Sequence, residues 1–153
     1  MSEGSWSPPK WMYRDRRPPN DDAYFENMTR VIFLAGLSWK MIIEKWPNFK
    51  KAFKNFCIDE VAKFGEDELC RLMSDAGIVR NRAKIIAAIN NAKQFQNIRK
   101  DYGSFQSYLD SLDKSNNYAL VIKELGKKFS RLGPSSTRIF LFSVGENIRR
   151  PEE

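Results

Sequence analysis

From Asn20 onward the chain repeats one pattern, in which apolar side chains recur three or four residues apart between short polar or glycine breaks. Residues at this spacing share one face of an α-helix, whereas a half-buried strand needs alternation every second residue. Sustained strand alternation is missing from the sequence, apart from short ambiguous runs such as 139–142. The sequence therefore predicts an all-α domain of short helices joined by brief connections.

Caps and breaks mark the expected helix boundaries. Asp21 or Asp22 is suited to cap the first helix, Gly36 ends it, and Ser38 caps the second. Pro47 suits the first turn of a third helix that carries three phenylalanines. The further expected helices are a short one opened by Asp59 and the ranges 66–74, 80–99, 104–112, 117–129 and 134–144.

The first twenty residues differ from the rest because they contain two proline pairs, Pro8-Pro9 and Pro18-Pro19. Proline pairs disfavour helix, so we expect an extended arm whose Trp6, Trp11 and Tyr13 tuck against the body. The predicted organisation is an arm over residues 1–20 packed on one helical domain over residues 21–150.

The charge balance favours a polyanionic partner. Lysine and arginine total 26 against 19 acids, which gives a net charge of +7. Much of the excess lies between Val121 and Arg150, where only Glu124 and Glu146 oppose a run of cations. Such a surplus suits a phosphate backbone, although many basic surfaces only keep a protein soluble.

The composition also argues against several classes of protein. The chain has two cysteines, Cys57 and Cys70, and no histidine, so we expect neither a zinc site nor another cofactor. It shows no apolar run long enough to cross a membrane and no secretory leader. We expect a cytoplasmic monomer with reduced thiols.

A glycine turn between two helices forms the first candidate site. A lysine-rich helix ends near Phe129, and a new helix begins at once after Leu132-Gly133-Pro134. Glycine lets a phosphate approach the backbone, and free amides at a helix start bind anions. A plain helical turn would show the same glycine and proline. The residues expected to contact DNA here are Arg131, Gly133, Ser135, Ser136, Thr137 and Arg138.

The second candidate site is Ala35-Gly36-Leu37-Ser38-Trp39, a helix break followed by a capped restart. Gly36 and Leu37 at such a break can wedge into a base stack, and Trp39 can face an extruded base. A tryptophan in the first turn of a helix is more often part of the core. A cleft formed by Trp39 with Trp6 and Tyr13 of the arm would suit a flipped base, above all a cationic one, but the spacing alone does not show that the three rings converge.

Together with the segment GIVRNRAKI at 77–85, these motifs resemble the DNA 3-methyladenine glycosylase I family over nearly the whole chain. The resemblance implies a helix-hairpin-helix glycosylase fold that flips an alkylated adenine out of duplex DNA and hydrolyses its N-glycosidic bond. It also implies that Trp6, Tyr13 and Trp39 bind the base.

Two departures from the family pattern are chemical. The family typically closes its termini with a zinc ion on two cysteines and two histidines, but this chain has Ser5 near the first cysteine position and Arg14 at a histidine position. The family also places a glutamate in the base pocket eight residues before the tryptophan, where this chain has Val31. Valine accepts no hydrogen bond, so any replacement must come from another acid such as Glu26 or Asp15.

The sequence thus predicts a metal-free DNA glycosylase of the 3-methyladenine type with an altered base pocket, acting on double-stranded DNA that carries a damaged base. Its catalytic residue is unassigned. The first alternative is a catalytically weak or inactive protein that still binds DNA or recognises a lesion. The second is a helical protein-interaction domain whose basic face serves only solvation.

Overall fold

The computed structural model describes residues 6–151, which fold into helices around one continuous apolar core. The elements are α1 (Asp21–Leu34), α2 (Trp39–Ala52), the 3-10 turn η2 (Lys54–Phe56), α3 (Ile58–Val61), α4 (Glu66–Met73), α5 (Arg82–Tyr102), α6 (Phe105–Asp110), α7 (Ser115–Lys128) and α8 (Pro134–Ser143). Between residues 6 and 151 no strand forms, and the only strand-like pairing is an isolated bridge from Tyr13 to Val144. The predicted all-α class is confirmed.

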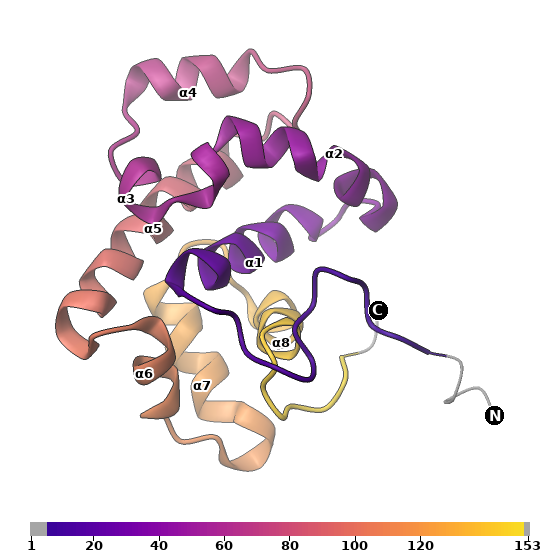
Figure 1. The fold of residues 1–153 in the computed structure, drawn as a ribbon, viewed down its shortest axis with the longest axis vertical. Helices are drawn as coiled ribbons and strands as arrows, with labels where there is room; N and C mark the ends of the chain where they lie inside the picture. The colour runs from indigo at the N-terminus through magenta and orange to yellow at the C-terminus, as the bar shows by residue number, and fades with distance from the viewer. Residues whose placement is uncertain (1–5, 152–153) are drawn as a thin grey trace.

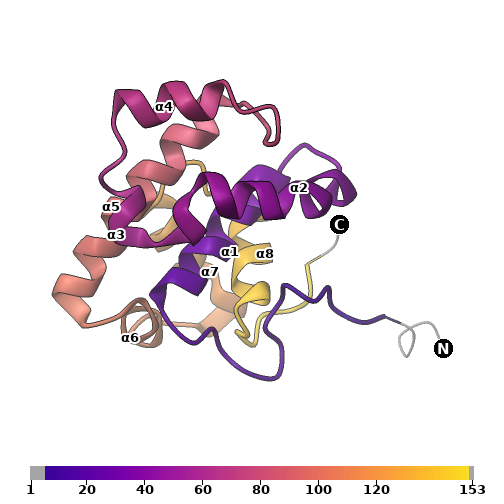
Figure 2. The same ribbon diagram turned by 45° about the horizontal axis from the view of Figure 1, so that its top comes forward.

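Helix α1 lies at the centre of the molecule, with α2 and α5 on one side and α8 on the other (Figure 1). From Tyr24 to Leu34 all of its side chains except that of Glu26 are buried, as expected for a helix surrounded by others. In the turned view α4 and α6 lie at opposite ends of the molecule (Figure 2). The described helices include none that is long and apolar enough to span a membrane.

The start of α1 organises two other helices. Asn20, and not Asp21 or Asp22 as predicted, caps α1 by accepting a hydrogen bond from the backbone nitrogen of Ala23 at 2.9 Å. The two aspartates instead accept hydrogen bonds from the first backbone nitrogens of α6 and α3, at Phe105 (3.0 Å) and Ile58 (3.1 Å). One end of α1 thus supplies caps for three helices, which fixes their relative positions.

Helix α2 corrects the expectation for Pro47, which lies inside the helix and does not begin a new one. A proline here leaves the carbonyl of Ile43 without its helical donor. The side chain of Ile43 is 43% exposed, so water can reach that side of the helix. Stacked rings on the other side, including Trp46 on Phe49 at 4.8 Å, keep the helix continuous. Ser38 caps α2 as predicted.

The arm is pinned to the segment that follows α8. The backbone nitrogen of Tyr13 donates to the Ser143 carbonyl at 2.8 Å, and Arg14 Nη1 donates to the carbonyls of Phe142 and Glu146. Gly145, at φ +87°, permits this approach because a Cβ there would lie 2.7 Å from the carbonyl oxygen of Arg16. The arm therefore has a fixed course along the C-terminal segment (Figure 1).

A buried carboxylate strengthens the same junction. Glu146 Oε2 lies 3.2 Å from Arg17 Nη2, and its Oε1 accepts a hydrogen bond from the Tyr118 hydroxyl at 2.9 Å and pairs with Lys114 at 3.2 Å. Burial, together with the hydrogen bond to Glu146, raises the pKa of Tyr118 above its usual value. The junction therefore links the arm, the start of α7 and the C-terminal segment.

A buried lysine of α5 anchors the turn between α1 and α2. Lys84, near the start of α5, donates to the carbonyl of Ala35 at 2.8 Å and to that of Phe33 at 3.4 Å. Burial lowers the pKa of Lys84, and the nearby charge of Arg131 lowers it further. A cation at the carboxyl end of a helix is favoured by the helix dipole, so Lys84 anchors the end of α1.

We predict that Lys84→Met lowers the free energy of unfolding by about 1–3 kcal/mol, because two carbonyls at the end of α1 lose a charged donor. Urea denaturation followed by circular dichroism measures the change. Lys93→Met, an exposed position on the same helix, is the control and should change stability by less than about 0.5 kcal/mol. Equal stability of the two variants would contradict an anchoring role for Lys84.

Candidate active site and nucleic-acid interface

A cavity of about 580 Å³ opens where the arm, the start of α2 and the outer face of α8 meet. Its size is within the range of small-molecule sites. Its lining is mostly aromatic and aliphatic. The lining residues are Trp6, Ser7, Pro9, Met12, Trp39, Ile139, Phe142, Arg150 and Pro151.

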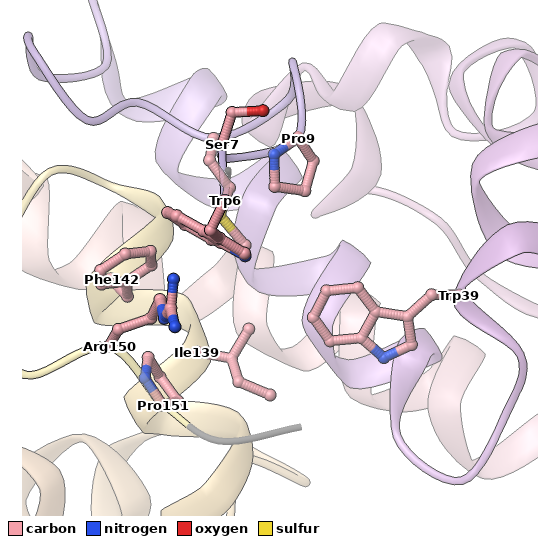
Figure 3. A pocket seen from close by; sticks show the side chains of 9 residues that line it. Trp6, Ser7, Pro9, Trp39, Ile139, Phe142, Arg150 and Pro151 are labelled. Atoms are coloured by element: carbon pink, nitrogen blue, oxygen red, sulfur yellow. The ribbon is translucent and has the colours of Figure 1, made fainter. Parts of the chain in front are cut away.

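The two predicted tryptophans lie on opposite sides of this cavity (Figure 3). Trp6 packs at 6.0 Å from the ring of Phe142 and is 38% exposed, so one face stays available. Trp39, at the first position of α2, is held by the Ser38 cap and rests on Trp11 of the arm at 6.2 Å. Two indoles across a cavity of this size provide stacking surfaces for a planar ring.

Tyr13 is not among the lining residues, contrary to the expectation that three rings would enclose the cavity. Its backbone is used in the bridge to Val144, and the guanidinium of Arg16 lies 4.7 Å from the centre of its ring. The structure therefore brings together Trp6 and Trp39 but not Tyr13.

Val31 also lies away from the cavity. It is 2% exposed, belongs to the apolar core, and does not appear in the cavity lining. A carboxylate at this position would be enclosed by apolar side chains in this structure. The site cannot be restored simply by adding the missing glutamate.

The two acids considered as replacements have other surroundings. Glu26 Oε2 accepts hydrogen bonds from Arg30 Nη2 at 3.0 Å and from Trp46 Nε1 at 2.9 Å. Asp15 is exposed on the arm. Neither acid lines the cavity, so no carboxylate does so among residues 6–151.

Arg30 forms a closed cation site beside the cavity. Its guanidinium carbon lies 4.9 Å from the Trp11 ring and 4.6 Å from the Trp46 ring. Burial lowers the pKa of Arg30 to about 10, opposed by the charge of Glu26. Glu26 is therefore engaged by Arg30 and Trp46, whereas Arg30 Nε and the indole nitrogen of Trp11 are buried without a hydrogen-bond partner.

The glycine turn between α7 and α8 forms the predicted hairpin. Asn91 of α5 holds it from behind, accepting from the Ser130 nitrogen at 2.7 Å and donating to the Ser130 carbonyl at 3.1 Å. Pro134 begins α8, so the free amides after it point out of the helix end. Of the predicted contacts, Arg131, Gly133, Ser135 and Arg138 are exposed and Ser136 is half-buried.

Thr137 does not fit its predicted contact with DNA. Its side chain is fully buried, and its hydroxyl donates to the carbonyls of Gly133 at 2.7 Å and Leu132 at 3.2 Å. Thr137 therefore closes the turn from inside. A phosphate at the hairpin would meet the residues on the outer side of the turn instead.

Gly133 and Gly36 are glycines for different reasons. Gly36 has φ +77°, a left-handed conformation that other residues adopt only with strain. Gly133 has φ −72° and ψ 176°, and a Cβ there would meet no atom within 4 Å. The fold therefore does not need a glycine at position 133.

Leu37, predicted as a wedge, is half-buried against the core, while Gly36 is exposed. Lys84 donates a hydrogen bond to the carbonyl of Ala35, just before Gly36, and the charge of Arg131 lowers the pKa of Lys84. A second cavity of about 430 Å³ between α7 and α8 is lined by Lys123, Lys127 and Arg138 with apolar neighbours. The cationic groups thus gather at the hairpin.

The residues do not fit the zinc ion that the resemblance implies. Arg14 has no metal-ligating atom, and its guanidinium is bonded to two carbonyls. Within residues 6–151, no group of three or more histidine, cysteine or acidic residues is placed to hold a metal. Position 5, which stands near the first cysteine of the family, lies outside the described residues.

Sequence reasoning missed much of the cavity lining, including Met12, Ile139, Phe142 and Arg150. The sequence pattern indicated only that Ile139 and Phe142 pack inside a helical domain. Arg150 was one of many cations near the end of the given sequence. The only available signal was the excess of aromatic residues, which indicated a pocket without locating it. Their joint position follows from the docking of the arm.

The chain matches the family model described as methyladenine glycosylase over residues 10–138. It is 36% identical over 75 residues to DNA-3-methyladenine glycosylase 1 of Escherichia coli (strain K12), and 31% identical over 75 residues to DNA-3-methyladenine glycosylase of Haemophilus influenzae. Each alignment covers 49% of this chain, and it spans only 40% of the length of the curated relative.

Solved structures are similar over a larger part of the chain. 3-Methyladenine DNA glycosylase I from Staphylococcus aureus, solved to show recognition of 3-methyladenine, has a TM-score of 0.75 and 27% identity, covering 85% of this chain and 79% of that one. A variant of 3-methyladenine DNA glycosylase I in complex with 3-methyladenine has a TM-score of 0.76 and 26% identity, with 88% and 81% covered. The helical architecture is therefore shared with these proteins.

We predict that Val31→Glu destabilises the protein by about 3 kcal/mol or more, because a carboxylate would be buried without a partner. Val31→Thr, which keeps the shape and replaces one methyl group with a hydroxyl, should cost about 1–3 kcal/mol. Urea denaturation gives both values. If Val31→Glu keeps the original stability, the position must open onto a cavity, and the assignment of Val31 to the core would be wrong.

Proposed function

Because this chain belongs to the methyladenine glycosylase family, we propose that it is a DNA glycosylase of the 3-methyladenine type. It binds duplex DNA, swings a damaged base into the cavity between Trp6 and Trp39, and hydrolyses the N-glycosidic bond of an alkylated purine. The products are the free base and an abasic site, as in the first step of base excision repair. The altered pocket decides which alkylated purine is accepted.

The observation that carries the proposal is that α8 bears both halves of such a site. Its first turn forms the hairpin at Gly133, and its outer face contributes Ile139 and Phe142 to the cavity. At a rise of 1.5 Å per residue, Phe142 lies about 14 Å along the helix from Gly133. A strand held by its phosphates at the hairpin would therefore present a nearby flipped base to the cavity.

Hydrolysis of the N-glycosidic bond of a cationic purine requires little chemical assistance from the protein. An alkylated purine that carries a positive charge leaves as a neutral base, and water then adds to the sugar carbon. Stacking between indoles holds the base out of the duplex at about 1–3 kcal/mol per contact. Fixing the extruded nucleotide in one orientation supplies the remaining acceleration.

The proposal includes a monomeric protein in the cytoplasm whose partner is double-stranded DNA with a damaged base. Cys57 and Cys70 are both free thiols, which is in keeping with a reducing compartment. The exposed cations at the hairpin fit a phosphate backbone.

The direct test is base release from methylated duplex DNA. We expect the purified protein to release free alkylated purine faster than the spontaneous rate, measured by chromatography of the released bases. Trp39→Ala should lower this rate about 5- to 100-fold, because it removes one stacking surface. Tight DNA binding with no release above the spontaneous rate would instead indicate a lesion-binding protein without turnover.

We predict that Gly133→Ala weakens binding to duplex DNA about tenfold, because a methyl group would keep a phosphate from the amides at the start of α8. Its stability should change by less than about 0.5 kcal/mol, since the backbone there is ordinary and the added Cβ meets no atom. Fluorescence anisotropy with a labelled duplex measures the affinity.

The matched control is Gly65→Ala, the same substitution at an exposed glycine before α4 whose φ is negative and where an added Cβ would lie 3.9 Å from Glu68 Oε1. It should leave the affinity for duplex DNA unchanged. If Gly133→Ala binds DNA as tightly as the unmodified protein, the hairpin does not bind the phosphate backbone.

A further inference from the structure

The stacking surface that Trp6 offers depends on how the arm is fixed to α8. Residues 6–9 of the arm form no helix or strand, so no regular structure of its own holds Trp6 in place. Trp6 instead packs on Phe142 of α8, with ring centres 6.0 Å apart, at one wall of the cavity (Figure 3). Ordering an extended segment costs conformational entropy, so fixed contacts must offset that cost. The residues that supply these contacts determine whether the cavity keeps two indole walls.

Arg14 holds both the backbone and the ring of Phe142. Its Nη1 donates to the carbonyl of Phe142 and, at 3.1 Å, to that of Glu146. Its guanidinium carbon lies 3.8 Å from the centre of the Phe142 ring, in the geometry of a cation–π pair. Arg14 does not itself line the cavity. It therefore acts on the cavity through Phe142, on which Trp6 packs.

A buried asparagine of α1 aligns the same two segments. Asn27 is 3% exposed, and its Nδ2 lies 3.3 Å from the carbonyl oxygens of both Trp11 and Ser143, to which it donates. The backbone nitrogen of Tyr13 donates to the same Ser143 carbonyl at 2.8 Å. Arg14 then binds carbonyls before and after Ser143 in the chain. The arm and the end of α8 are therefore fixed in one register by consecutive hydrogen bonds.

The polarity of this junction is the reverse of that of a metal site. In a metal site side chains donate electron pairs to a cation, whereas here a cationic side chain donates N–H groups to backbone carbonyls. Arg14 stands at a histidine position of the family pattern and has no atom that could ligate zinc. The disagreement with the zinc ion that the resemblance implies thus has a structural counterpart, because the guanidinium makes the contacts between the two segments.

We propose that Arg14 is a positioning residue for the base cavity. It closes the arm onto α8 in place of a metal ion, and it thereby holds Phe142 and Trp6 where an extruded base stacks. This inference rests on the proposed glycosylase function, because it concerns the cavity of that site. It assigns to one side chain of the arm the geometry of a wall that this side chain does not form.

The first test is the binding of free 3-methyladenine, followed by quenching of tryptophan fluorescence. Arg14→Met should weaken this binding about tenfold, because two charge-assisted hydrogen bonds and the contact with the Phe142 ring are lost. Arg16→Met is the matched control on the same arm, since Arg16 is exposed and lies over Tyr13, which does not line the cavity. It should keep the affinity of the unmodified protein. Equal affinities of the two variants, or no binding by the unmodified protein, would overturn the inference.

Two further measurements separate positioning from general loss of structure. The affinity of Arg14→Met for undamaged duplex DNA should change less than about twofold, because the hairpin at Gly133 lies at the other end of α8. Arg14→Lys keeps the charge and a donor for the same carbonyls, so its affinity for 3-methyladenine should lie between those of Arg14→Met and the unmodified protein. A parallel loss of duplex binding in Arg14→Met, or no recovery in Arg14→Lys, would contradict a positioning role.

Hydrogen exchange reports closure of the arm without any ligand. In Arg14→Met the arm amides, including that of Tyr13, should exchange about tenfold faster than in the unmodified protein, while those of α5 keep their rates. Dialysis of the unmodified protein against EDTA should change neither the exchange of the arm nor the binding of 3-methyladenine. Faster exchange of the arm after EDTA treatment would show that a metal ion holds the junction, and it would overturn the inference.

Base release from methylated duplex DNA separates this inference from the proposed activity. We expect the single-turnover rate of Arg14→Met to fall about tenfold, in step with its weaker binding of the base. If Arg14→Met opens the arm and weakens base binding, but the unmodified protein releases no base, the glycosylase proposal fails and the positioning role stands. If the unmodified protein and Arg14→Met release base at the same rate, the positioning role fails and the glycosylase proposal stands.

Discussion

The docking of the arm onto the segment after α8 is the interaction on which the cavity depends. The arm supplies Trp6, Pro9 and Met12, and the opposite wall comes from α8 and the residues after it. Without the arm, Trp39 and Phe142 would lie on an open surface. Ordering a chain segment costs about 1–2 kcal/mol per residue, so the arm needs strong fixed contacts. The backbone bond from Tyr13 to Ser143 and the two bonds of Arg14 provide them at the point nearest the cavity.

Arg14 shows how the junction can be held without the metal that the resemblance implies. A guanidinium stays protonated and cannot ligate a cation, but its planar fork donates to two acceptors at once. Here the acceptors are backbone carbonyls, so the contact fixes the course of the chain and not only a side chain. Glu146 adds a buried carboxylate with three donors around it. Burying ion pairs of this kind costs desolvation free energy, so they add little net stability. Removing one partner is strongly destabilising, so the ion pairs of Glu146 hold the junction in one arrangement.

The sequence predicted the helical class and the hairpin, because these depend on local periodicity, caps and glycine breaks, whereas the meeting of Trp6 and Trp39 was expected only from the family resemblance. It failed where tertiary contacts decide. The proline in α2 is tolerated because stacked rings hold the helix, and Asp21 and Asp22 cap other helices because α1 is central. Arg150 reaches the cavity only because the chain end folds back beside the arm. Residues 6 and 150 share no local pattern, so no spacing rule joins them.

No carboxylate lines the described walls of the cavity, so these walls offer no carboxylate as a general base. A glycosidic bond breaks through a sugar with oxocarbenium character, which is electrophilic enough to react with water once the base has gone. A cationic purine leaves as a neutral base, so the remaining demand on the protein is to hold the extruded nucleotide in one orientation for attack by water. Val31 belongs to the apolar core and does not line this cavity, so the residue at position 31 acts on the cavity only through packing.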